Sequence, residues 1–441
     1  MGQGIARWLL LSRWLLGALS AGAPSGSWSG GASNREGESS PPLMVNSKRP
    51  ISIAVVSDAV YPFHRGGKET RYHELLTRLH SVADFTVYTM HWWPEQERTR
   101  RTEGVEYRAI CPLFPLYRHG RRSMLEAIAF SLACLRLIGR RFDVVETDHI
   151  PHLHLFTLRL VTKLRRRPLV VTWHEVWGRE YWINYLGRVA GVVAWWVERR
   201  AMGLPDEILA VSAGTADRLR SFLGDSVPVR IIQNAIDLDL IASVAPAVPD
   251  EAGELLFVGR LLEHKGVHLL IDSLAKLQSG RPLRLIVVGT GPERANLEQH
   301  ALEAGVGTLI RFRSDVSDAK EVYALMKAAE VFVCPSVREG FGIALLEALA
   351  CGTAVVTTSH PDNFGRVLAT RSDRGYLAEP TVDAITTAIQ QALKDRSRPR
   401  KAPEGWLREF DWSVVSEEYL EALRAVTSRA GPRGPIEADA T

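Results

Sequence analysis

The sequence predicts an α/β protein built from two doubly wound parallel-sheet domains. Three observations carry this prediction. The length of 441 residues suggests two or three domains. Apolar, strand-like runs alternate with helical stretches through residues 51–232. A Pro/Ala linker at 242–252 then precedes a fresh strand at 255–258, after which the alternation resumes.

Composition points to an ordinary globular protein with an uneven charge. Hydrophobic residues make 46% of the chain and charged residues 24%. Residues 51–235 have 26 Lys and Arg against 19 Asp and Glu, whereas residues 236–441 have 23 against 29. The basic half could face anionic lipid, an anionic acceptor or nucleic acid, or simply be a soluble Arg-rich surface. We expect no nucleic-acid partner.

The four cysteines give no sign of a disulfide frame or a zinc site. They are far apart, form no C-x-x-C pair and mostly sit in apolar runs: Cys111, Cys134, Cys334 and Cys351. A reducing cytoplasm is therefore the expected location.

Residues 1–43 contain an apolar run at 8–23 and then a Gly/Ser-rich segment. The run superficially resembles a signal peptide, but Arg13 interrupts it, and it is too short to span a bilayer. We favour the hypothesis that translation begins at Met44, because residues 44–50 lead straight into the first strand at 51–56. On either reading, a disordered extension is expected.

The first half opens with a strand, a loop and a helix. The strand at 51–56 is followed by a loop that ends in Gly66-Gly67 and by a helical pattern at 68–79. A Gly pair there lets the backbone approach a ligand, although a tight turn would explain it equally well. Further strand-like runs lie at 85–89, 105–110, 143–146, 169–173, 207–211 and 229–232.

Histidines follow two of these strands. His174 comes directly after the run at 169–173, so it should lie at the carboxyl edge of the sheet, where such sheets bind ligands. His149, His152 and His154 follow the strand at 143–148, with a spacing that fits no metal site. We treat these three as candidate ligand-binding residues at that edge of the sheet.

Three basic stretches with apolar residues lie in this half, at 121–141, 163–167 and 185–200. Each alone could be a core-facing helix with solvated Arg ends. Together they favour peripheral contact with an anionic membrane surface.

In the second half, strand ends carry cations and glycines. The strand at 255–258 runs into Gly259-Arg260, with Lys265-Gly266 shortly after, and the run at 283–288 is followed by Gly289-Thr290-Gly291. Two fixed cations at a strand end could neutralise a phosphate group. Asp237-Leu238-Asp239 has the form of a metal-binding D-x-D, but nothing else supports that role, and we predict no metal.

The central stretch is a strand at 331–334, a loop that carries Glu339, and an apolar helix that carries Glu347. This order places one carboxylate and several free backbone N–H groups at the carboxyl edge of a sheet. Glu347 lies on so apolar a segment that it should be buried and need hydroxyl or N–H partners.

Glu339 and Glu347, with seven residues between them, resemble the E-x7-E element of glycosyltransferase family 4. Arg260 and Lys265 match the order and spacing of that family, and the resemblance covers roughly residues 50–428. It implies the GT-B fold, in which two Rossmann-like domains face a central cleft, and a retaining transfer of sugar from a nucleotide-diphosphate-sugar.

The resemblance also implies roles for individual residues. The residues expected at the reacting sugar and diphosphate are His174, Arg260, Lys265 and Glu339. The residues expected to bind the donor are Gly66, Gly67, Gly259, Gly289, Gly291, Gly340, Phe341, Gly342, Ile343 and Glu347. The segment 359–366 departs from the family's Gly-Gly-x-x-Glu, which leaves the sugar open.

The three basic stretches favour a lipid-linked acceptor, and a polysaccharide or another glycan is the other possibility; His149, His152 and His154 are candidates on the acceptor side. Neither metal nor cofactor is expected. Two alternatives remain: a nucleotide-sugar epimerase of the same fold, and a non-catalytic nucleotide-sugar-binding subunit. The expected location is the cytoplasm, with peripheral contact at the inner face of the plasma membrane. The expected parts are an N-terminal extension (1–43), an acceptor-side domain (44–235), a nucleotide-sugar domain (236–405), a crossover helix (406–428) and a disordered tail (429–441).

Overall fold

The computed structural model describes residues 50–118, 121–248, 253–278, 282–316, 318–395 and 405–429. All of these lie within one unit, Pro50–Thr441. The predictions for the extension at 1–43, for a start at Met44 and for the tail from residue 430 onward fall outside the described residues.

The first sheet has eight strands in the order β10-β9-β8-β7-β1-β2-β4-β3. They are parallel except for β3, which pairs antiparallel with β4. Every strand-like run predicted in this half overlaps one of them, because both faces of a parallel sheet are covered and its strands read as apolar runs. The antiparallel edge strand β3 was not predicted. The strands are β1 (Ser52–Val56), β2 (Asp84–Met90), β3 (Thr99–Thr102), β4 (Val105–Cys111), β7 (Val144–Asp148), β8 (Leu169–Trp173), β9 (Glu207–Ala210) and β10 (Val229–Ile231).

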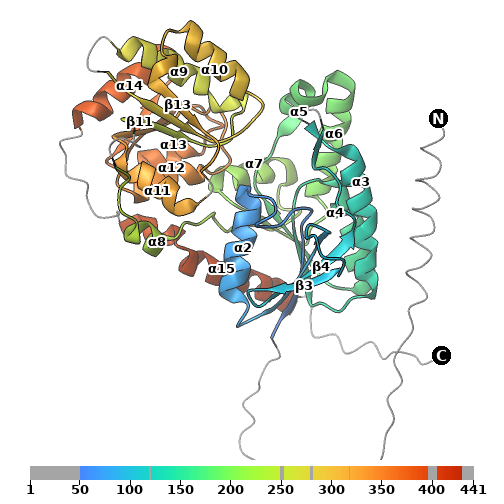
Figure 1. The fold of residues 1–441 in the computed structure, drawn as a ribbon. Helices are drawn as coiled ribbons and strands as arrows, with labels where there is room; N and C mark the ends of the chain where they lie inside the picture. The colour runs from blue at the N-terminus through green and yellow to red at the C-terminus, as the bar shows by residue number, and fades with distance from the viewer. Residues whose placement is uncertain are drawn as a thin grey trace, which may run out of the picture. The chain divides into compact units, whose positions relative to one another are not determined.

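Helices flank this sheet, and a short hairpin of β5 (Tyr117–Arg118) and β6 (Arg121–Arg122) precedes α3. Figure 1 shows α3, α4 and α6 together on one side of the sheet, with α2 away from them. The helices are α2 (Gly67–Leu79), α3 (Met124–Ala133), η1 (Cys134–Gly139), α4 (Leu153–Arg165), α5 (Gly178–Leu186), α6 (Arg188–Met202), α7 (Ala213–Leu223) and α8 (Leu238–Ser243).

The linker expected at 242–252 begins later than predicted. Asp237 caps α8 by accepting a hydrogen bond from the backbone N–H of Leu240 at 2.8 Å, and the helix runs to Ser243. Ala242 and Ser243 are therefore helical.

The second sheet has six parallel strands in the order β13-β12-β11-β14-β15-β16. The two edge strands, β13 and β16, were not predicted; they are only partly buried, so their sequences lack the apolar run of a central strand. The strands are β11 (Leu255–Val258), β12 (Leu285–Val288), β13 (Ile310–Arg313), β14 (Val331–Cys334), β15 (Ala354–Thr358) and β16 (Gly375–Ala378).

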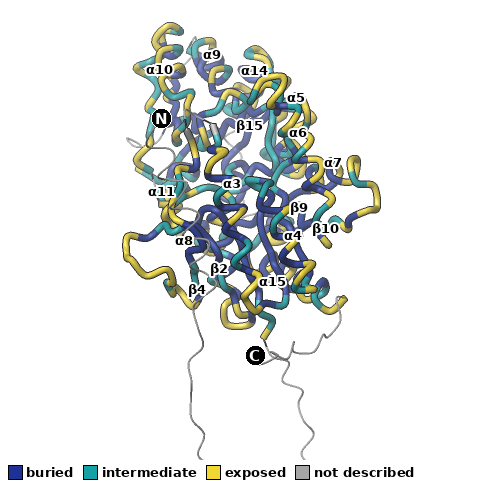
Figure 2. Tube along the Cα trace, turned by 90° about the vertical axis from the view of Figure 1, so that its right-hand side faces the viewer, coloured by how far each residue is buried: buried dark blue, intermediate teal, exposed yellow. Residues whose placement is uncertain are grey.

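Helices and short 3-10 turns connect these strands, and Figure 2 shows the central strand β15 in the dark blue of buried residues. The connecting elements are η2 (Glu263–Lys265), α9 (Val267–Leu277), α10 (Arg294–Glu303), η3 (Gly307–Leu309), α11 (Ala319–Ala328), α12 (Ile343–Ala350), α13 (Gly365–Thr370) and α14 (Val382–Lys394).

The C-terminal segment, η5 (Gly405–Phe410) and α15 (Trp412–Arg429), returns to the first sheet. α15 lies beside α2 in Figure 1, and its buried Val415 and Tyr419 share a core with Leu75 and Leu76 of α2. The crossover helix expected at 406–428 is divided into η5 and α15, and Arg429, expected in the tail, ends α15 and pairs with Glu207.

Candidate active site

Two backbone hydrogen bonds hold Glu339 against the segment that follows β15. The Glu339 N–H donates to the Asp362 carbonyl at 3.0 Å, and the Phe364 N–H donates to the Glu339 carbonyl at 2.9 Å. The buried Asn363 amide holds the second loop by donating to Thr357 Oγ1 and to the Thr358 carbonyl, both at 2.9 Å. The segment that departs from the family pattern therefore positions the Glu339 backbone.

Lys265 and Glu339 form an ion pair. Lys265 ends η2 after β11, and Glu339 lies in the loop after β14, the strand next to β11 in the sheet. Their side chains are 18% and 16% exposed, so both can be reached from solvent. Burial alone would lower the pKa of Lys265, but the Glu339 carboxylate outweighs it and the pKa is raised, so the amine stays charged.

Arg260 is exposed at the end of β11, and its guanidinium lies 5.6 Å from the ring centroid of Tyr117 in the β5–β6 hairpin. The two predicted cations therefore differ in their surroundings: Lys265 is paired with a carboxylate, and Arg260 lies beside an aromatic ring.

His174 lies just beyond β8 and meets the Glu339 loop. A Cβ on Gly340 would lie 2.6 Å from the His174 carbonyl oxygen, so only glycine allows this approach. The His174 N–H donates to His149 Nδ1 at 3.3 Å, while its Nε2 has no hydrogen-bond partner among the described residues. Burial, with the nearby charges of Arg71 and Lys68, lowers the pKa of His174 to about 3, so the ring is neutral.

Arg338 links the same two segments from the other side. Its guanidinium donates to the Glu175 carboxylate and, at 2.9 Å, to the Val176 carbonyl, and it lies 4.3 Å from the centroid of Tyr181. The structure thus brings the segment after β8, which carries His174, against the loop that carries Glu339.

Glu347 lies on the second turn of α12 and is half-buried. The Tyr323 hydroxyl of α11 donates to its Oε1 at 3.0 Å, which supplies the hydroxyl partner that the sequence required. Burial raises the pKa of Glu347 to about 7. Sequence reasoning missed Tyr323, because it lies in a helix outside any motif.

Two of the predicted glycines, Gly289 and Gly291, are required for close packing between neighbouring loops. A Cβ on Gly289 would lie 1.9 Å from the Gly259 carbonyl oxygen, and one on Gly291 would lie 2.2 Å from the Leu261 carbonyl oxygen. These glycines let the loops after β11 and β12 touch.

The remaining predicted donor residues lie around the start of two helices. Gly66 caps α2, Gly67 is its first residue, and a Cβ on Gly67 would lie 3.6 Å from Cδ1 of Ile343, the first residue of α12. Gly342 precedes α12 with φ of 92°. Phe341 is buried against Phe364 and Phe410, so its side chain belongs to the core.

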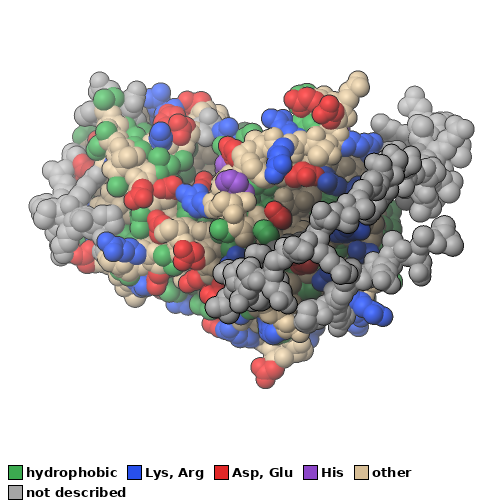
Figure 3. Space-filling model, turned by 90° about the horizontal axis from the view of Figure 1, so that it is seen from below, with side chains coloured by type: hydrophobic (Ala, Val, Ile, Leu, Met, Phe, Trp, Pro, Cys, Tyr) green, Lys and Arg blue, Asp and Glu red, His purple; other side chains and the backbone are tan. Residues whose placement is uncertain are grey.

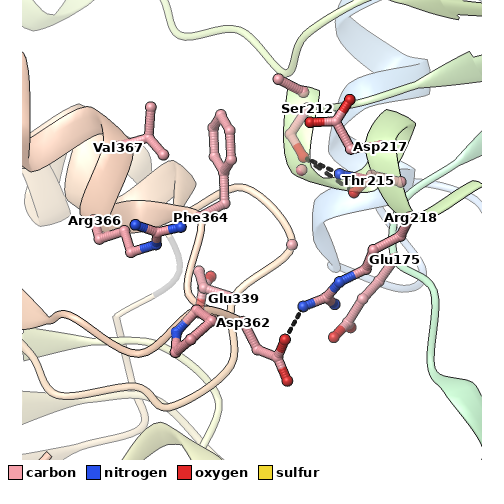
Figure 4. A pocket seen from close by; sticks show the side chains of 14 residues that line it. Glu175, Ser212, Thr215, Asp217, Arg218, Glu339, Asp362, Phe364, Arg366 and Val367 are labelled. Atoms are coloured by element: carbon pink, nitrogen blue, oxygen red, sulfur yellow. Dashed lines mark hydrogen bonds and ion pairs between the residues drawn. The ribbon is translucent and has the colours of Figure 1, made fainter. Parts of the chain in front are cut away.

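A cavity of about 240 Å³ borders Glu339 and Gly340. Figure 4 shows Phe364, Arg366 and Val367 on one side of it and Ser212 and Thr215 on the other, with Arg218 reaching Asp362 in an ion pair. Ser212 caps α7 by accepting a hydrogen bond from the Thr215 N–H at 3.0 Å.

A second polar cluster, missed from the sequence, lies at the carboxyl edge of the first sheet. Lys68 pairs with Asp58 after β1 and with Asp148 at the end of β7, and Arg122 pairs with Asp58 as well. Asp58 and Asp148 are fully buried. Burial opposes ionisation of Asp58, yet the two cations outweigh it and hold its pKa below the ordinary range. The sequence did contain a signal for this cluster: an acidic residue, Asp58 or Asp148, lies at the end of each of two strand-like runs.

The histidines proposed for the acceptor side are buried. Burial lowers the pKa of His152 and His154 to about 3, so both are neutral, and His149 stacks on Trp173 at 4.9 Å between centroids. His149 supports the His174 backbone.

The described residues hold no group of three or more His, Cys, Asp or Glu that could bind a metal ion. Asp237, the first acid of the D-x-D sequence, caps α8 and pairs with Arg78 at 2.8 Å.

Two family sequence patterns match the chain. The pattern described as "Glycosyltransferase Family 4" matches residues 65–240, and the one described as "Glycosyl transferases group 1" matches residues 243–405. The chain belongs to glycosyltransferase family 4. Between them, the two matched segments hold every residue singled out above for catalysis or donor binding.

Curated relatives of this family 4 chain are also glycosyl-transfer enzymes. It is 28% identical to a glycogen synthase of Mycobacterium tuberculosis, over 88% of this chain and 98% of that protein. It is 30% identical to an alpha-maltose-1-phosphate synthase of Mycolicibacterium smegmatis, over 54% of this chain and 67% of that protein. A phosphatidyl-myo-inositol mannosyltransferase of M. tuberculosis is 33% identical to it, over 44% of this chain and 53% of that protein. The family 4 chain is accordingly a glycosyltransferase.

Solved structures share the fold. Sucrose-phosphate synthase from Thermosynechococcus elongatus superposes with a TM-score of 0.72 at 18% identity, over 86% of this chain and all of that one. The Anabaena protein HepE, solved with UDP and glucose, superposes with a TM-score of 0.63 at 17% identity, over 85% of this chain and all of that one. Together with the two parallel sheets, these likenesses confirm the predicted GT-B fold.

Proposed function

We propose that this glycosyltransferase moves a sugar from a nucleotide-diphosphate-sugar to a lipid-linked, polysaccharide or other glycan acceptor, with retention at the anomeric carbon. The observation that carries the proposal is the meeting of Lys265, Glu339 and the His174 segment at the carboxyl edges of the two sheets. In this proposal the donor sugar lies between them.

The charges suit the departure of a diphosphate. As the bond between the anomeric carbon and the diphosphate oxygen breaks, negative charge grows on that oxygen, and Lys265 and Arg260 would stabilise it. Glu339 would accept hydrogen bonds from sugar hydroxyls, and the neutral His174 would orient the ring. The proposal assigns no metal to the reaction.

Glu347 fits the ribose of the nucleotide. Its Oε1 accepts a hydrogen bond from Tyr323, and the second carboxylate oxygen can accept one from a ribose hydroxyl. The relatives support a nucleotide-sugar donor, since HepE was solved with UDP and glucose. The phosphatidyl-myo-inositol mannosyltransferase supports a lipid-linked acceptor and therefore a place at the inner face of a membrane.

Product analysis tests the proposal. The protein is incubated with a nucleotide-sugar and a membrane glycolipid extract, and the products are resolved by NMR. The expected result is free nucleoside diphosphate and a new glycosidic bond with the anomeric configuration of the donor. An inverted product would overturn retention; free epimerised sugar would establish the epimerase; nucleotide binding without any product would favour the non-catalytic subunit.

A further inference from the structure

We propose that α3, α4 and α6 together form a docking face for an anionic lipid surface. The proposal deepens the proposed function, since a lipid-linked acceptor must be reached at a membrane. The docking face is defined by the exposed apolar side chains Met124, Leu125, Ile128 and Leu132 of α3, Phe156, Leu160 and Leu164 of α4, and Val189, Val193 and Trp196 of α6.

Exposed apolar side chains are concentrated on these helices. Of the 21 large hydrophobic side chains exposed among the described residues, these ten lie on three helices of 10, 13 and 15 residues. Val189 is 82% exposed and Met124 is 64% exposed. Apolar side chains gathered to this degree mark a contact surface.

The exposed side chains form stripes that differ from the core-facing ones. On α4, residues 156, 160 and 164 repeat every four positions and are exposed, whereas Leu155, Leu158 and Val161 are fully buried. Residues four apart lie on the same side of a helix. The helix therefore already has its core face, and the second apolar stripe has no partner among the described residues.

The three helices are neighbours. Ser131 of α3 donates to the Leu153 carbonyl of α4 at 3.0 Å and lies 2.8 Å from Thr157 Oγ1, and α4 also packs against α6. Figure 2 turns this side of the molecule toward the viewer, with α3, α4 and α6 next to one another. The stripes therefore lie on one side of the protein.

The charge on these helices suits an anionic partner. Their acids, Glu126 and Glu198, are both buried, so the helices expose cations but no carboxylate; the exposed cations include Lys163, Arg199 and Arg200. The Arg200 guanidinium lies 4.8 Å from the Trp196 ring, which places a cation beside an exposed aromatic side chain. Trp at the headgroup level with Arg at the phosphates is the arrangement of an interfacial helix.

A different face shows the contrast. In the part of Figure 3 not covered by grey atoms, acidic and basic side chains alternate, and hydrophobic ones form small separate areas. Such a mixture has no preference for anionic lipid.

The docking face adjoins the candidate active site. α3 begins directly after the β5–β6 hairpin, whose Tyr117 ring lies 5.6 Å from Arg260. α6 follows α5, whose Tyr181 ring lies 4.3 Å from Arg338. A lipid-anchored acceptor could thus reach the donor without leaving the membrane surface.

Vesicle co-sedimentation tests the docking face. The full chain is mixed with vesicles of phosphatidylcholine alone or with added phosphatidylglycerol, at low and at high salt. The variants are the triple change Ile128→Ser, Leu160→Ser and Val193→Ser, and the double change Lys163→Glu and Arg200→Glu. The matched control changes similarly exposed residues elsewhere: Val248→Ser, Leu302→Ser and Leu377→Ser.

The wild type and the control are expected to pellet with the anionic vesicles only, and high salt should release both. The triple variant should bind about tenfold more weakly or worse, because apolar area is lost. The double variant should also lose at least about tenfold, since each cation near an anionic surface contributes about fivefold.

The docking face would be overturned if the wild type did not pellet with the anionic vesicles, or if the control lost as much vesicle binding as the triple variant. It would also be overturned if the wild type were a dimer and the triple change alone made it monomeric, because the face would then bind a second copy of the chain. The melting-temperature shift with nucleotide diphosphates is measured on the same variants. If the melting-temperature shift persists but the wild type does not bind vesicles, only the docking face is wrong. If the protein binds vesicles but shows no melting-temperature shift, the proposed transfer is wrong.

Discussion

The carboxyl edges of the two sheets both carry charged residues, but they use them differently. At the second sheet, Glu339 pairs with one cation among the residues that the structure describes, Lys265, and both side chains remain partly exposed. At the first sheet, buried Asp58 has two cationic partners, Lys68 and Arg122. The cations at the two edges are about equally exposed, at 14% and 19% for Lys68 and Arg122 and 18% for Lys265. The difference lies in the carboxylates: Glu339 remains accessible to a ligand, whereas Asp58 is fully buried beneath its cations.

The largest expected effect concerns Lys265. Lys265→Met should lower the rate of transfer by about 100-fold to 1,000-fold, because the leaving diphosphate loses a fixed positive charge. Steady-state kinetics with a nucleotide-sugar measure the loss. Lys276→Met, at an exposed Lys of α9 that pairs with Asp383, is the control and should stay near wild type. A Lys265→Met rate within threefold of wild type would mean that the accessible charge is not used in the reaction.

Gly340→Ala tests the contact between the two edges. The added Cβ would meet the His174 carbonyl oxygen, so the Glu339 loop must shift. A displacement of this kind should lower kcat/KM by roughly tenfold to 100-fold. Gly139→Ala, where a Cβ would meet nothing within 4 Å, should have no such effect. Equal kcat/KM in the two variants would show that His174 and Glu339 need not be held together.

Two carboxyls with raised pKa values, one at each sheet, extend the comparison to its pH dependence. Burial raises the pKa of Glu146 in β7 and of Glu347 in α12 to about 7 each, from 4.5 when exposed. The folded state therefore binds these protons more tightly, and each carboxyl reduces stability as pH rises from about 4.5 to 7. Glu146→Gln and Glu347→Gln should each gain stability relative to wild type over that window, by up to about 3 kcal/mol.

Only one of these two variants should affect donor binding. The rise in melting temperature with nucleotide should be lost in Glu347→Gln and kept in Glu146→Gln. Glu146 is a structural residue, because its Oε1 accepts hydrogen bonds from Tyr72 at 3.1 Å and from Thr172 at 2.6 Å. Denaturant unfolding at pH 5 and pH 7.5 measures the stability difference. Loss of the nucleotide shift in both, or in neither, would remove the distinction between a structural and a ligand-binding carboxyl.

The smallest effect is expected for Tyr323→Phe. Removing the hydroxyl takes one hydrogen bond from Glu347, which typically costs about 1 kcal/mol, or roughly fivefold in nucleotide affinity. Calorimetric titration with the nucleoside diphosphate measures it. Unchanged affinity would show that Tyr323 does not position the carboxylate.

The sequence was informative where function depends on short-range spacing. Glu339 and Glu347 lie eight positions apart, and Arg260 and Lys265 five apart, so each pair could be read directly. The alternation of strands and helices likewise predicted the parallel sheets, because buried central strands must be apolar.

The sequence was uninformative where contacts depend on the strand order. Lys68 and Asp148 are 80 positions apart and meet only because β1 and β7 are neighbours in the sheet. Gly340 and His174 meet across the two sheets, so the reason for that glycine could not be seen from its own loop. The edge strands β13 and β16 escaped prediction because partial burial leaves them without an apolar run.

Thermal shift with a panel of nucleotide diphosphates and nucleotide-sugars tests the central claim most directly, with Arg260→Ala and Lys265→Ala as controls. A ligand that binds the folded state raises the melting temperature by mass action. We predict a rise with one nucleotide class in the wild type, lost in both variants. A melting temperature unchanged by every member of the panel, or raised equally in the wild type and both variants, would contradict a donor site built on these two cations.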